Sequence, residues 1–277
     1  MSTRPPDPDS LRYARHWEPV LAGPARRALA RITPVPGTFL DLGAGTGSLA
    51  LAAAARWPAA SIFALDASAG MLSVARQRAA DEGHDPERFT WLPADAADIP
   101  LDASSVDAVA SSFVLQLPDD RPAVLAEVRR VLRPGGVFAF VTWLAEELEL
   151  PAEKRFLDVL EALGIEEEAE EEGFRNPRPR DFHSLEQARD ELAAAGFAGI
   201  EVGLDELRHA WTADSYLAYK EHYDEHELFE SLDAAVRERL RSELAQRLAP
   251  LPAAAFELRG PLVTAVVRRP LGDDARR

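Results

Sequence analysis

Strand-like and helix-like stretches alternate regularly between residues 38 and 143. The strand-like stretches are short apolar runs at 39–42, 61–65, 89–92, 106–113 and 137–143. Helical signals occur between some of them, at 48–57, 68–82 and 122–132, and a tight turn is expected at 132–136. Such alternation produces parallel strands joined by right-handed helical crossovers. The pattern therefore predicts an α/β fold with a doubly wound sheet.

The regular alternation ends after Trp143. Residues 144–182 are acidic and helical in character, with a proline-rich joint at 176–180. Beyond them we expect a helix at 185–195 capped by Ser184, a strand at 199–204, helices within 211–248, and a closing strand at 256–267 interrupted at Gly260 and Pro261. The two late strands make the expected sheet seven-stranded and mostly parallel. The inserted helices form a cap over its edge.

The residues before the first strand have a different character. Met1 to Ser10 are polar and proline-rich, so we expect a disordered tail. Apolar residues recur at helical spacing from Leu11 to Leu21, and Pro24 begins a second expected helix that runs to Ile32.

Composition and charge restrict the function classes. No run reaches the roughly 20 apolar residues of a membrane span, no signal-peptide core is present, and the chain has no cysteine. We therefore expect a cytoplasmic protein without disulfides or thiolate metal sites. The formal net charge of -16 argues against a nucleic-acid substrate, because phosphates require a basic surface. The acidic run 166–172 is expected to be a solvated lid surface.

One glycine-rich turn joins the first strand to the helix that follows it. Its pattern is Asp41-x-Gly43-x-Gly45-x-Gly47. Glycine permits positive φ and leaves no Cβ in the way of a ligand, and the start of a helix offers free N–H groups. Gly45-x-Gly47-x-x-Ala50 also fits the dinucleotide pattern. The carboxylate of Asp41, however, suits a ligand with an ammonium group better than a pyrophosphate. A glycine-rich turn without any ligand is the remaining alternative.

Further motifs follow this turn in order and at domain spacing. They are Leu65–Leu72, Ala94–Ala96, Ser105–Asp107, Phe113–Asp119 and Leu132–Gly136. With these motifs the chain resembles the class I S-adenosylmethionine (SAM)-dependent methyltransferases. More narrowly, it resembles their small-molecule branch, which includes the ubiquinone and menaquinone C-methyltransferases. The resemblance covers most of residues 38–143 and extends more weakly to the final strands.

The resemblance implies a Rossmann-like methyltransferase fold, SAM as cofactor and S-adenosylhomocysteine (SAH) as product. It divides the chain into 1–37 (tail and lid helices), 38–143 (SAM-binding core), 144–182 (helical cap insertion), 183–210 (core helix and strand), 211–250 (helical cap) and 251–277 (closing strand and tail). The cap regions and the N-terminal helix are then expected to select a small-molecule acceptor. Neither the acceptor nor the oligomeric state follows from the sequence.

The resemblance also implies cofactor contacts. Those to the methionine portion are assigned to Gly43, Gly45, Thr46 and Gly47, with Asp41 near the ammonium group and Ser112 near the methyl donor. Those to the nucleoside are assigned to Asp66 for the ribose hydroxyls, to neighbouring Ala67, to Met71 against the adenine or ribose, and to Asp95 and Ala96 for the adenine edge. Several of these residues could instead have a purely structural role, such as helix capping for Asp66 and core packing for Met71.

Few side chains are candidates for catalysis. Because the sulfonium is already a good leaving group, in-line methyl transfer depends mainly on positioning, and a base is needed only if the acceptor must lose a proton early. Tyr13 and His16 on the N-terminal helix are the candidates. Gln116 stands in a segment where the family often has histidine, and an amide cannot act as a base at neutral pH.

Other polar and aromatic residues support weaker hypotheses. His222 and His226 have a spacing found in metal sites, but a third ligand is not evident, so we expect no metal. Trp211, Tyr216, Tyr219 and Tyr223 form either an aromatic wall for an acceptor or part of the core.

Three functions remain open. The leading one is a SAM-dependent methyltransferase that moves a methyl group to an O, N or C nucleophile of a small molecule. The alternatives are an NAD(P)-dependent oxidoreductase that uses the Gly45–Ala50 pattern, and a SAM-binding protein that has lost its chemistry.

Overall fold

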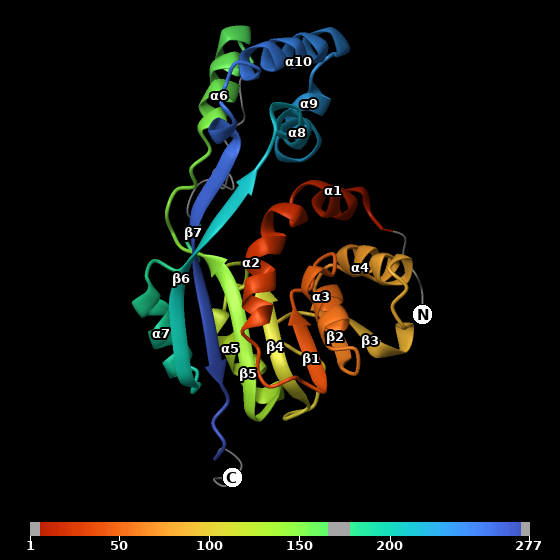
Figure 1. Ribbon diagram of the computed structural model, residues 1–277, viewed down its shortest axis with the longest axis vertical. Coiled ribbons are helices and arrows are strands. Elements are labelled where there is room, and N and C mark those ends of the chain that lie inside the picture. The colour runs from red at the N-terminus through yellow and green to blue at the C-terminus, as the bar shows by residue number, and fades with distance from the viewer. Residues whose placement is uncertain (1–5, 166–177, 273–277) are drawn as a thin grey trace.

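The computed structural model describes residues 6–165 and 178–272 (Figure 1). A single sheet with strand order β3-β2-β1-β4-β5-β7-β6 forms its centre. The strands are β1 Thr38–Leu42, β2 Ser61–Asp66, β3 Phe89–Pro93, β4 Val106–Ser112, β5 Leu132–Trp143, β6 Ala198–Ala210 and β7 Glu257–Arg268. Strands β1 to β5 are parallel, and β7 runs antiparallel to both β5 and β6. The expected seven-stranded, mostly parallel and doubly wound sheet is confirmed.

Helices cover both faces of this sheet. The elements α2 Glu18–Ala30, α3 Ser48–Arg56 and α4 Ala69–Asp81 pack on one face, and α5 Arg121–Val131 and α7 Leu185–Ala194 pack on the other. Side chains alternate between the two faces of a strand, so Phe39 of β1 joins the first core whereas Leu40 and Leu42 join the second. The side chains of Ser68 and Ser184 cap α4 and α7, as the sequence predicted.

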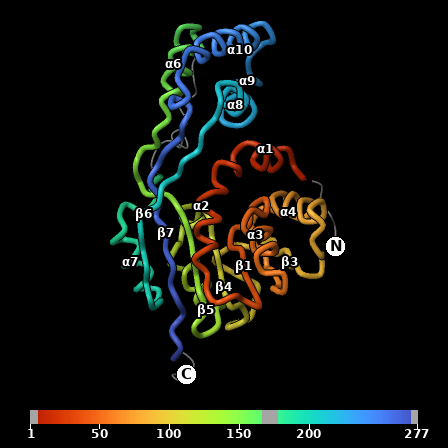
Figure 2. Tube along the Cα trace, viewed as in Figure 1, coloured from red at the N-terminus to blue at the C-terminus, as the bar shows by residue number. Residues whose placement is uncertain are grey.

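A helical cap stands beyond the carboxyl ends of the parallel strands, carried by the long β6–β7 ribbon (Figures 1 and 2). Its elements are α6 Pro151–Leu163, α8 Ala213–Tyr219, the π-helical turn Lys220–Asp224, α9 His226–Ser231, α10 Ala234–Leu248 and the short helix Ala253–Phe256. Phe156, Tyr216 and Leu244 belong to a separate core that also contains Trp17 and Leu21. The cap is thus attached to the body of the protein through the N-terminal helices.

The N-terminal helices differ from the sequence prediction. Helix α1 already begins at Pro8, because the side chain of Asp7 accepts a hydrogen bond from the N–H of Ser10, so the expected tail is wrong for residues 7–10. The break between the two helices falls at Trp17, and Pro24 lies inside α2. Pro19, in the first turn of α2, cannot donate a hydrogen bond back into α1, so the break has a local cause. Trp17 at the break is buried against the cap.

Three strands differ from the prediction. β6 extends to Ala210, well beyond the expected range 199–204. β5 begins at Leu132, where a tight turn was expected, and Leu132 pairs with Val106 before a register shift. β7 continues through Gly260 and Pro261, where an interruption was expected. A Cβ at Gly260 would lie 2.0 Å from Cδ2 of Leu148, so this glycine makes room for a side chain that crosses the strand.

Two expectations concern residues outside the described ranges. The acidic run 166–172 lies wholly outside them, and the proline-rich joint 176–180 lies partly outside. Among the helices that are described, none combines the length and apolar character that crossing a bilayer requires.

Candidate functional site

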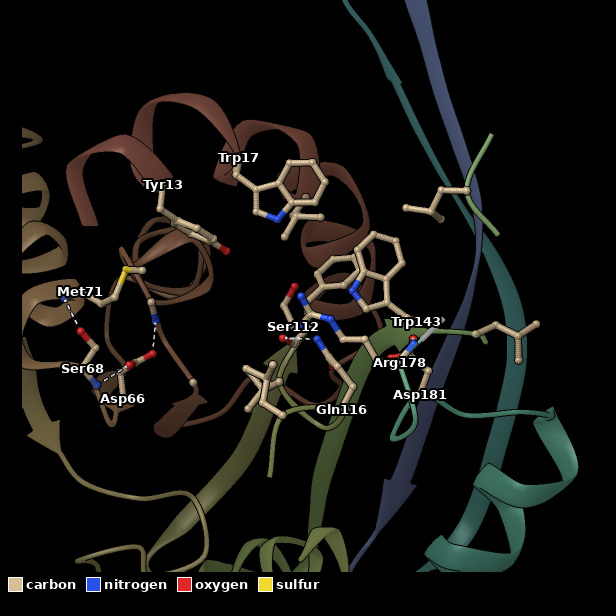
Figure 3. Close-up of a pocket in the computed structure, with 18 of the residues that line it drawn as sticks. Tyr13, Trp17, Asp66, Ser68, Met71, Ser112, Gln116, Trp143, Arg178 and Asp181 are labelled. Atoms are coloured by element: carbon tan, nitrogen blue, oxygen red, sulfur yellow. Dashed lines mark hydrogen bonds between the residues drawn. The ribbon is translucent and has the colours of Figure 1, made fainter. Parts of the chain in front are cut away.

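A cavity of about 330 Å³ opens between the carboxyl ends of the strands and the cap. Figure 3 shows Asp66, Ser68 and Met71 on one side of it and Trp143, Arg178 and Asp181 on the other, with Tyr13 and Trp17 above. We call these two parts the glycine-loop side and the aromatic side. The first also includes Gly43 and Gly45, and the second also includes Phe113, Gln116, Glu146 and Tyr223.

The glycines of the turn after β1 are needed for different structural reasons. Gly43, Gly45 and Gly47 have φ values of 71°, 53° and 92°. A Cβ at Gly47 would lie 2.9 Å from the Cβ of Ala75, so Gly47 lets α3 approach α4 closely. A Cβ at Gly45 would meet no atom within 4 Å, and Gly45 lines the cavity. The loop therefore leaves an open cradle at Gly45 that a ligand can fill.

Asp66 is fixed at the carboxyl end of β2. Its Oδ2 accepts a hydrogen bond from the N–H of Gly45 at 2.8 Å, and its Oδ1 accepts one from the N–H of Ser68 at 2.8 Å. Burial raises the pKa of Asp66, while these two hydrogen bonds lower it. Because each carboxylate oxygen can accept more than one hydrogen bond, both remain able to bind a pair of ligand hydroxyls.

Asp41 is buried at the end of β1. Its Oδ2 accepts a hydrogen bond from the N–H of Ala50 at 2.8 Å in the first turn of α3. It also lines a smaller pocket of about 40 Å³, next to the main cavity, together with Thr46 and Ser112. Burial raises the pKa of Asp41 to about 8, against the lowering effect of the Ala50 hydrogen bond. A ligand cation beside it would favour the ionised form.

Glu18 connects α2 to the glycine loop. Its Oε2 contacts the hydroxyl of Thr46 and the guanidinium of Arg78, and Arg78 also donates to the carbonyl of Thr46 at 2.9 Å. The charges of Glu18 and Asp66 both raise the pKa of Asp41, so these carboxylates act on the same small region. Because Arg78 is paired with Glu18, Asp66 is the carboxylate of this group whose charge favours a cationic ligand over a pyrophosphate.

The aromatic side is built from rings that come from four segments. The Trp17 ring stacks on Tyr223, with centroids 6.1 Å apart and planes 11° apart. The centroids of Phe113 and Trp143 are 4.6 Å apart. Tyr13 lines both pockets, and its burial raises the pKa of its phenol, so the hydroxyl stays protonated and can donate a hydrogen bond.

The turn after β4 holds a non-glycine residue in the left-handed region. Phe113 has φ 57°. Nε2 of the buried Gln116 donates to the carbonyl of Phe113 at 2.7 Å, and the hydroxyl of Thr142 donates to Oε1 of Gln116 at 2.6 Å. Gln116 therefore stabilises a strained turn in the wall of the cavity.

The segment 178–182 closes the aromatic side. Arg121 donates to the carbonyl of Arg180 at 2.6 Å, and its guanidinium lies 3.9 Å from the centroid of the Phe182 ring. Arg121 also forms two hydrogen bonds with Glu191 of α7, at 2.6 and 2.8 Å, and one with the carbonyl of Leu115 at 3.3 Å. One partly buried arginine of α5 thus joins both loops of the aromatic side to α7.

Comparison with known proteins identifies the family. The model of the methyltransferase domain matches residues 39–136. The ubiquinone/menaquinone biosynthesis C-methyltransferase UbiE of Desulfotalea psychrophila is 33% identical over 172 residues, which are 60% of this chain and 68% of that protein. The chain belongs to the class I SAM-dependent methyltransferases.

Other known proteins are similar to a shorter part of the chain or share only its fold. The malonyl-[acyl-carrier protein] O-methyltransferase of Xylella fastidiosa is 40% identical over 103 residues, which are 37% of this chain and 34% of that protein. The chain therefore spans about a third of that relative's length. The structure of Haemonchus contortus phosphoethanolamine N-methyltransferase 2 with SAH has a TM-score of 0.52 at 20% identity and covers 92% of this chain and 53% of that one. It confirms the methyltransferase fold.

Most of the predicted cofactor residues lie together in this member of the family. Those that line one of the two pockets are Asp41, Gly43, Gly45, Thr46, Asp66, Met71 and Ser112. Gly47 lies behind the loop, against Ala75. Ala67, Asp95 and Ala96 do not line either pocket, and Oδ1 of the exposed Asp95 accepts a hydrogen bond from the N–H of Ala97. Their contacts with adenine stay predictions.

The two predicted catalytic residues lie in different places. Tyr13 faces the cavity, whereas His16 does not line it and stands 5.8 Å, centroid to centroid, from His222. Burial lowers the pKa of His16, and the charges of His222 and Arg15 lower it further. Sequence reasoning missed Glu18, Arg121 and Asp181, because each is brought to the site by the packing of segments far apart in the chain.

A group of carboxylates in the cap has the spacing of a metal site. Oxygens of Glu153, Asp224 and Glu225 lie within 4.8 Å of one another. The ammonium group of Lys220 stands among them, 3.0 Å from Glu153 and 2.8 Å from Glu225, and it also contacts Asp224. A protein cation thus fills the place that a metal would take.

Proposed function

We propose that this protein transfers the methyl group of SAM to an O, N or C nucleophile of a small-molecule acceptor held on the aromatic side of the cavity. The observation that carries this proposal is the continuity of the cavity. Its glycine-loop side has an open cradle beside three carboxylates, and its aromatic side combines aromatic rings with a few polar side chains. Its volume is near the lower end of the roughly 300–1,000 Å³ range of small-molecule sites.

The residues of the glycine-loop side fit SAM. Asp66 presents two oriented acceptors for the ribose hydroxyls, and the open space at Gly45 admits the cofactor close to the backbone. Asp41 would hold the ammonium group of the methionine portion, and Met71 would cover the nucleoside. When bound, SAM supplies a methyl group on a positively charged sulfur. The carboxylates of this region favour that positive charge.

The remaining residues would orient the acceptor and exclude water. Trp17 and Tyr13 cover the cavity from the N-terminal helices, and Phe113 and Trp143 form its far wall. Holding two reactants in attack geometry can lower a barrier by roughly 7–11 kcal/mol, so positioning can account for most of the catalysis. Tyr13 would contribute a hydrogen bond from its protonated phenol. We propose that residues 144–182 and 211–250 and the N-terminal helices select the acceptor.

The names of the relatives suggest the acceptor class. One of those proteins acts in quinone biosynthesis and another on a malonyl group attached to a carrier protein. The rings of Trp17, Phe113, Trp143 and Tyr223 would stack against a flat ring better than they would enclose a flexible anionic chain. We therefore infer a planar acceptor for this chain.

An oxidoreductase is less compatible with this loop. A dinucleotide phosphate needs free N–H groups at the start of the helix. In this protein, the N–H of Gly45 donates to Asp66 and that of Ala50 donates to Asp41. The charge of Asp66 would also repel a pyrophosphate.

The decisive experiment is calorimetric titration of the protein with SAM, SAH, NAD and NADP. We expect binding of the two adenosyl ligands only. Asp66→Asn should weaken SAH binding by roughly 10–100-fold, since hydrogen bonds to a charged group contribute about 1.5–3 kcal/mol. Asp190→Asn, at an exposed position of α7, is the matched control and should leave the affinity unchanged. Binding of NAD or NADP without SAM would overturn the proposal.

A non-catalytic SAM-binding protein is the second candidate. It is favoured by the role of Gln116, which stabilises the Phe113 turn where the family often has histidine. Release of SAH from SAM in the presence of a panel of phenols, amines and quinols separates the two candidates. Tight binding of SAM without SAH formation from any acceptor would support the second one.

A further inference from the structure

Asp181 has one carboxylate oxygen that the protein itself does not use. The side chain is only 4% exposed and lines the aromatic side of the cavity. Its Oδ2 accepts a hydrogen bond from the N–H of Arg178 at 2.8 Å, and its own N–H donates to the carbonyl of Arg178 at 3.0 Å. Its buried Oδ1 has no hydrogen-bond partner among the described residues.

This arrangement differs from that of the other polar groups nearby. Both ends of the Gln116 amide are bonded to protein groups, and Asp66 accepts two backbone N–H groups. A buried polar atom without a partner costs about 1–3 kcal/mol, and more when the group is charged. Burial raises the pKa of Asp181, against the lowering effects of the Arg178 N–H and of the positive charges of Arg178 and Arg121.

The position of Asp181 is nevertheless rigidly fixed. The carbonyl of Phe182 accepts a hydrogen bond from the N–H of Ala145 at 2.8 Å, and Leu144 and Phe182 form a parallel bridge just after β5. Arg121 holds the same segment at Arg180 and Phe182. The Asp181 side chain lines the cavity on a fixed backbone and keeps one acceptor unsatisfied, and these are the features of a preorganised binding group.

We propose that Oδ1 of Asp181 accepts a hydrogen bond from the acceptor substrate, so that this site selects planar apolar molecules that carry a hydroxyl or amino group. This proposal rests on the proposed function and deepens it. The aromatic rings bind the flat body of the acceptor, and Asp181 binds its donor group. A molecule of the same shape that has only a carbonyl oxygen at that position cannot donate a hydrogen bond to Oδ1. Its oxygen would then lie against Oδ1, so that two hydrogen-bond acceptors face each other. A site of this kind discriminates strongly, because the wrong substrate leaves a buried charge unpaired.

The test uses two naphthalene probes, 2-naphthol as the donor and the larger 2-acetylnaphthalene as the acceptor-only compound. Each is titrated calorimetrically into the full-length protein saturated with SAH. We expect the wild-type protein to bind 2-naphthol roughly tenfold or more tightly than 2-acetylnaphthalene. Asp181→Asn keeps an amide oxygen for the Arg178 N–H and replaces Oδ1 with a donor, so it should reverse the preference.

Asp190→Asn is the matched control. Asp190 is a carboxylate at an exposed position of α7 and does not line the cavity. The preference for 2-naphthol should survive this substitution, and SAH affinity should be the same in both variants and the wild type. Loss of the preference in Asp190→Asn, or its persistence in Asp181→Asn, would overturn the proposal.

Two further outcomes keep the test decisive. If Asp181→Asn fails to fold, the wild-type protein alone decides, since equal affinity for both probes contradicts the proposal. If SAH does not bind, the proposed function fails, whereas the probe preference measured without SAH still reports on Asp181.

Discussion

The N–H of Gly45 donates a hydrogen bond to Oδ2 of Asp66 across 2.8 Å. This bond joins the loop after β1 to the end of β2, two segments separated by 21 residues. The groups proposed to bind the methionine portion and the ribose are therefore held in one rigid unit. A ligand that uses both does not have to order either of them first, which strengthens its binding.

Gly45→Ala should abolish SAM binding without unfolding the protein. The added Cβ points into open space beside the cavity, where the cofactor is proposed to lie. Gly83→Ala is a matched control, because Gly83 also has positive φ, 73°, and no atom near its Cβ position, but it follows α4 away from the cavity. Both variants should lose about 1–2 kcal/mol of stability from backbone strain. Calorimetry with SAH and chemical denaturation measure the two effects, and equal SAH affinity in both variants would contradict the placement.

Asp41 should make cofactor binding depend on pH. Its pKa, about 8 in the folded protein, is far above its ordinary value of 3.8, so it retains a proton at neutral pH. A bound ammonium group would stabilise the ionised form, and binding would release that proton. SAH affinity should therefore rise between pH 6 and 8, and Asp41→Asn should remove most of this rise. Calorimetry in buffers of different ionisation enthalpy measures the proton directly, and unchanged proton release in the variant would refute this role.

The raised pKa of Asp41 should also make the folded protein less stable as pH rises. Between pH 3.8 and about 8 the unfolded chain loses the Asp41 proton while the folded protein keeps it. The contribution of Asp41 to stability is thus fully present below 3.8 and is lost as pH rises to about 8. Compared with the wild type, Asp41→Asn should become progressively more stable as pH increases across this range, as measured by urea denaturation. An equal pH dependence in both proteins would exclude the effect.

Arg121 should act as a positioning residue for the aromatic side. Arg121→Met removes the hydrogen bonds to Leu115, Arg180 and Glu191 but keeps an apolar stem against Phe182. We expect KM for the acceptor to rise severalfold while SAH affinity stays unchanged. Arg133→Met removes a comparable arginine bonded to Asp107 and Thr38 at the opposite end of the sheet. A similar rise of KM in both variants would indicate a general loss of stability.

Lys220 should be essential for the stability of the cap. It is fully buried, and its ammonium group contacts three carboxylates and lies 4.2 Å from the centroid of the Phe156 ring. Lys220→Met leaves those carboxylates without their cation, and loss of one partner of a buried ion pair costs about 3–5 kcal/mol. Lys154→Met, at an exposed position of α6, should cost much less. Guanidinium denaturation followed by circular dichroism measures both, and similar midpoints would show that the cluster is not stabilising.

Local features of the chain were predictable because local physics determines them. The strands of residues 38–143, the caps at Ser68 and Ser184 and the glycine turn depend on apolar periodicity, on side-chain hydrogen bonds over three residues and on positive φ. The errors have different causes. The break between the N-terminal helices follows Pro19 in the first turn of α2, which is a local feature, whereas Leu148 crosses β7 at Gly260 through a contact between segments far apart in the chain.

By itself, the sequence determined a seven-stranded doubly wound sheet, the glycine-rich turn at residues 41–47 and the position of Asp66 at the carboxyl end of the second strand. Parallel strands place their carboxyl ends together, so residues at those ends are predictable neighbours. Only the tertiary structure decided that the cap stands over that edge, that Lys220 fills the acidic cluster, and that Arg121 fixes Asp181 in the cavity wall. These features depend on how separate segments meet, and the energies of such contacts are set by burial and geometry that no local pattern specifies.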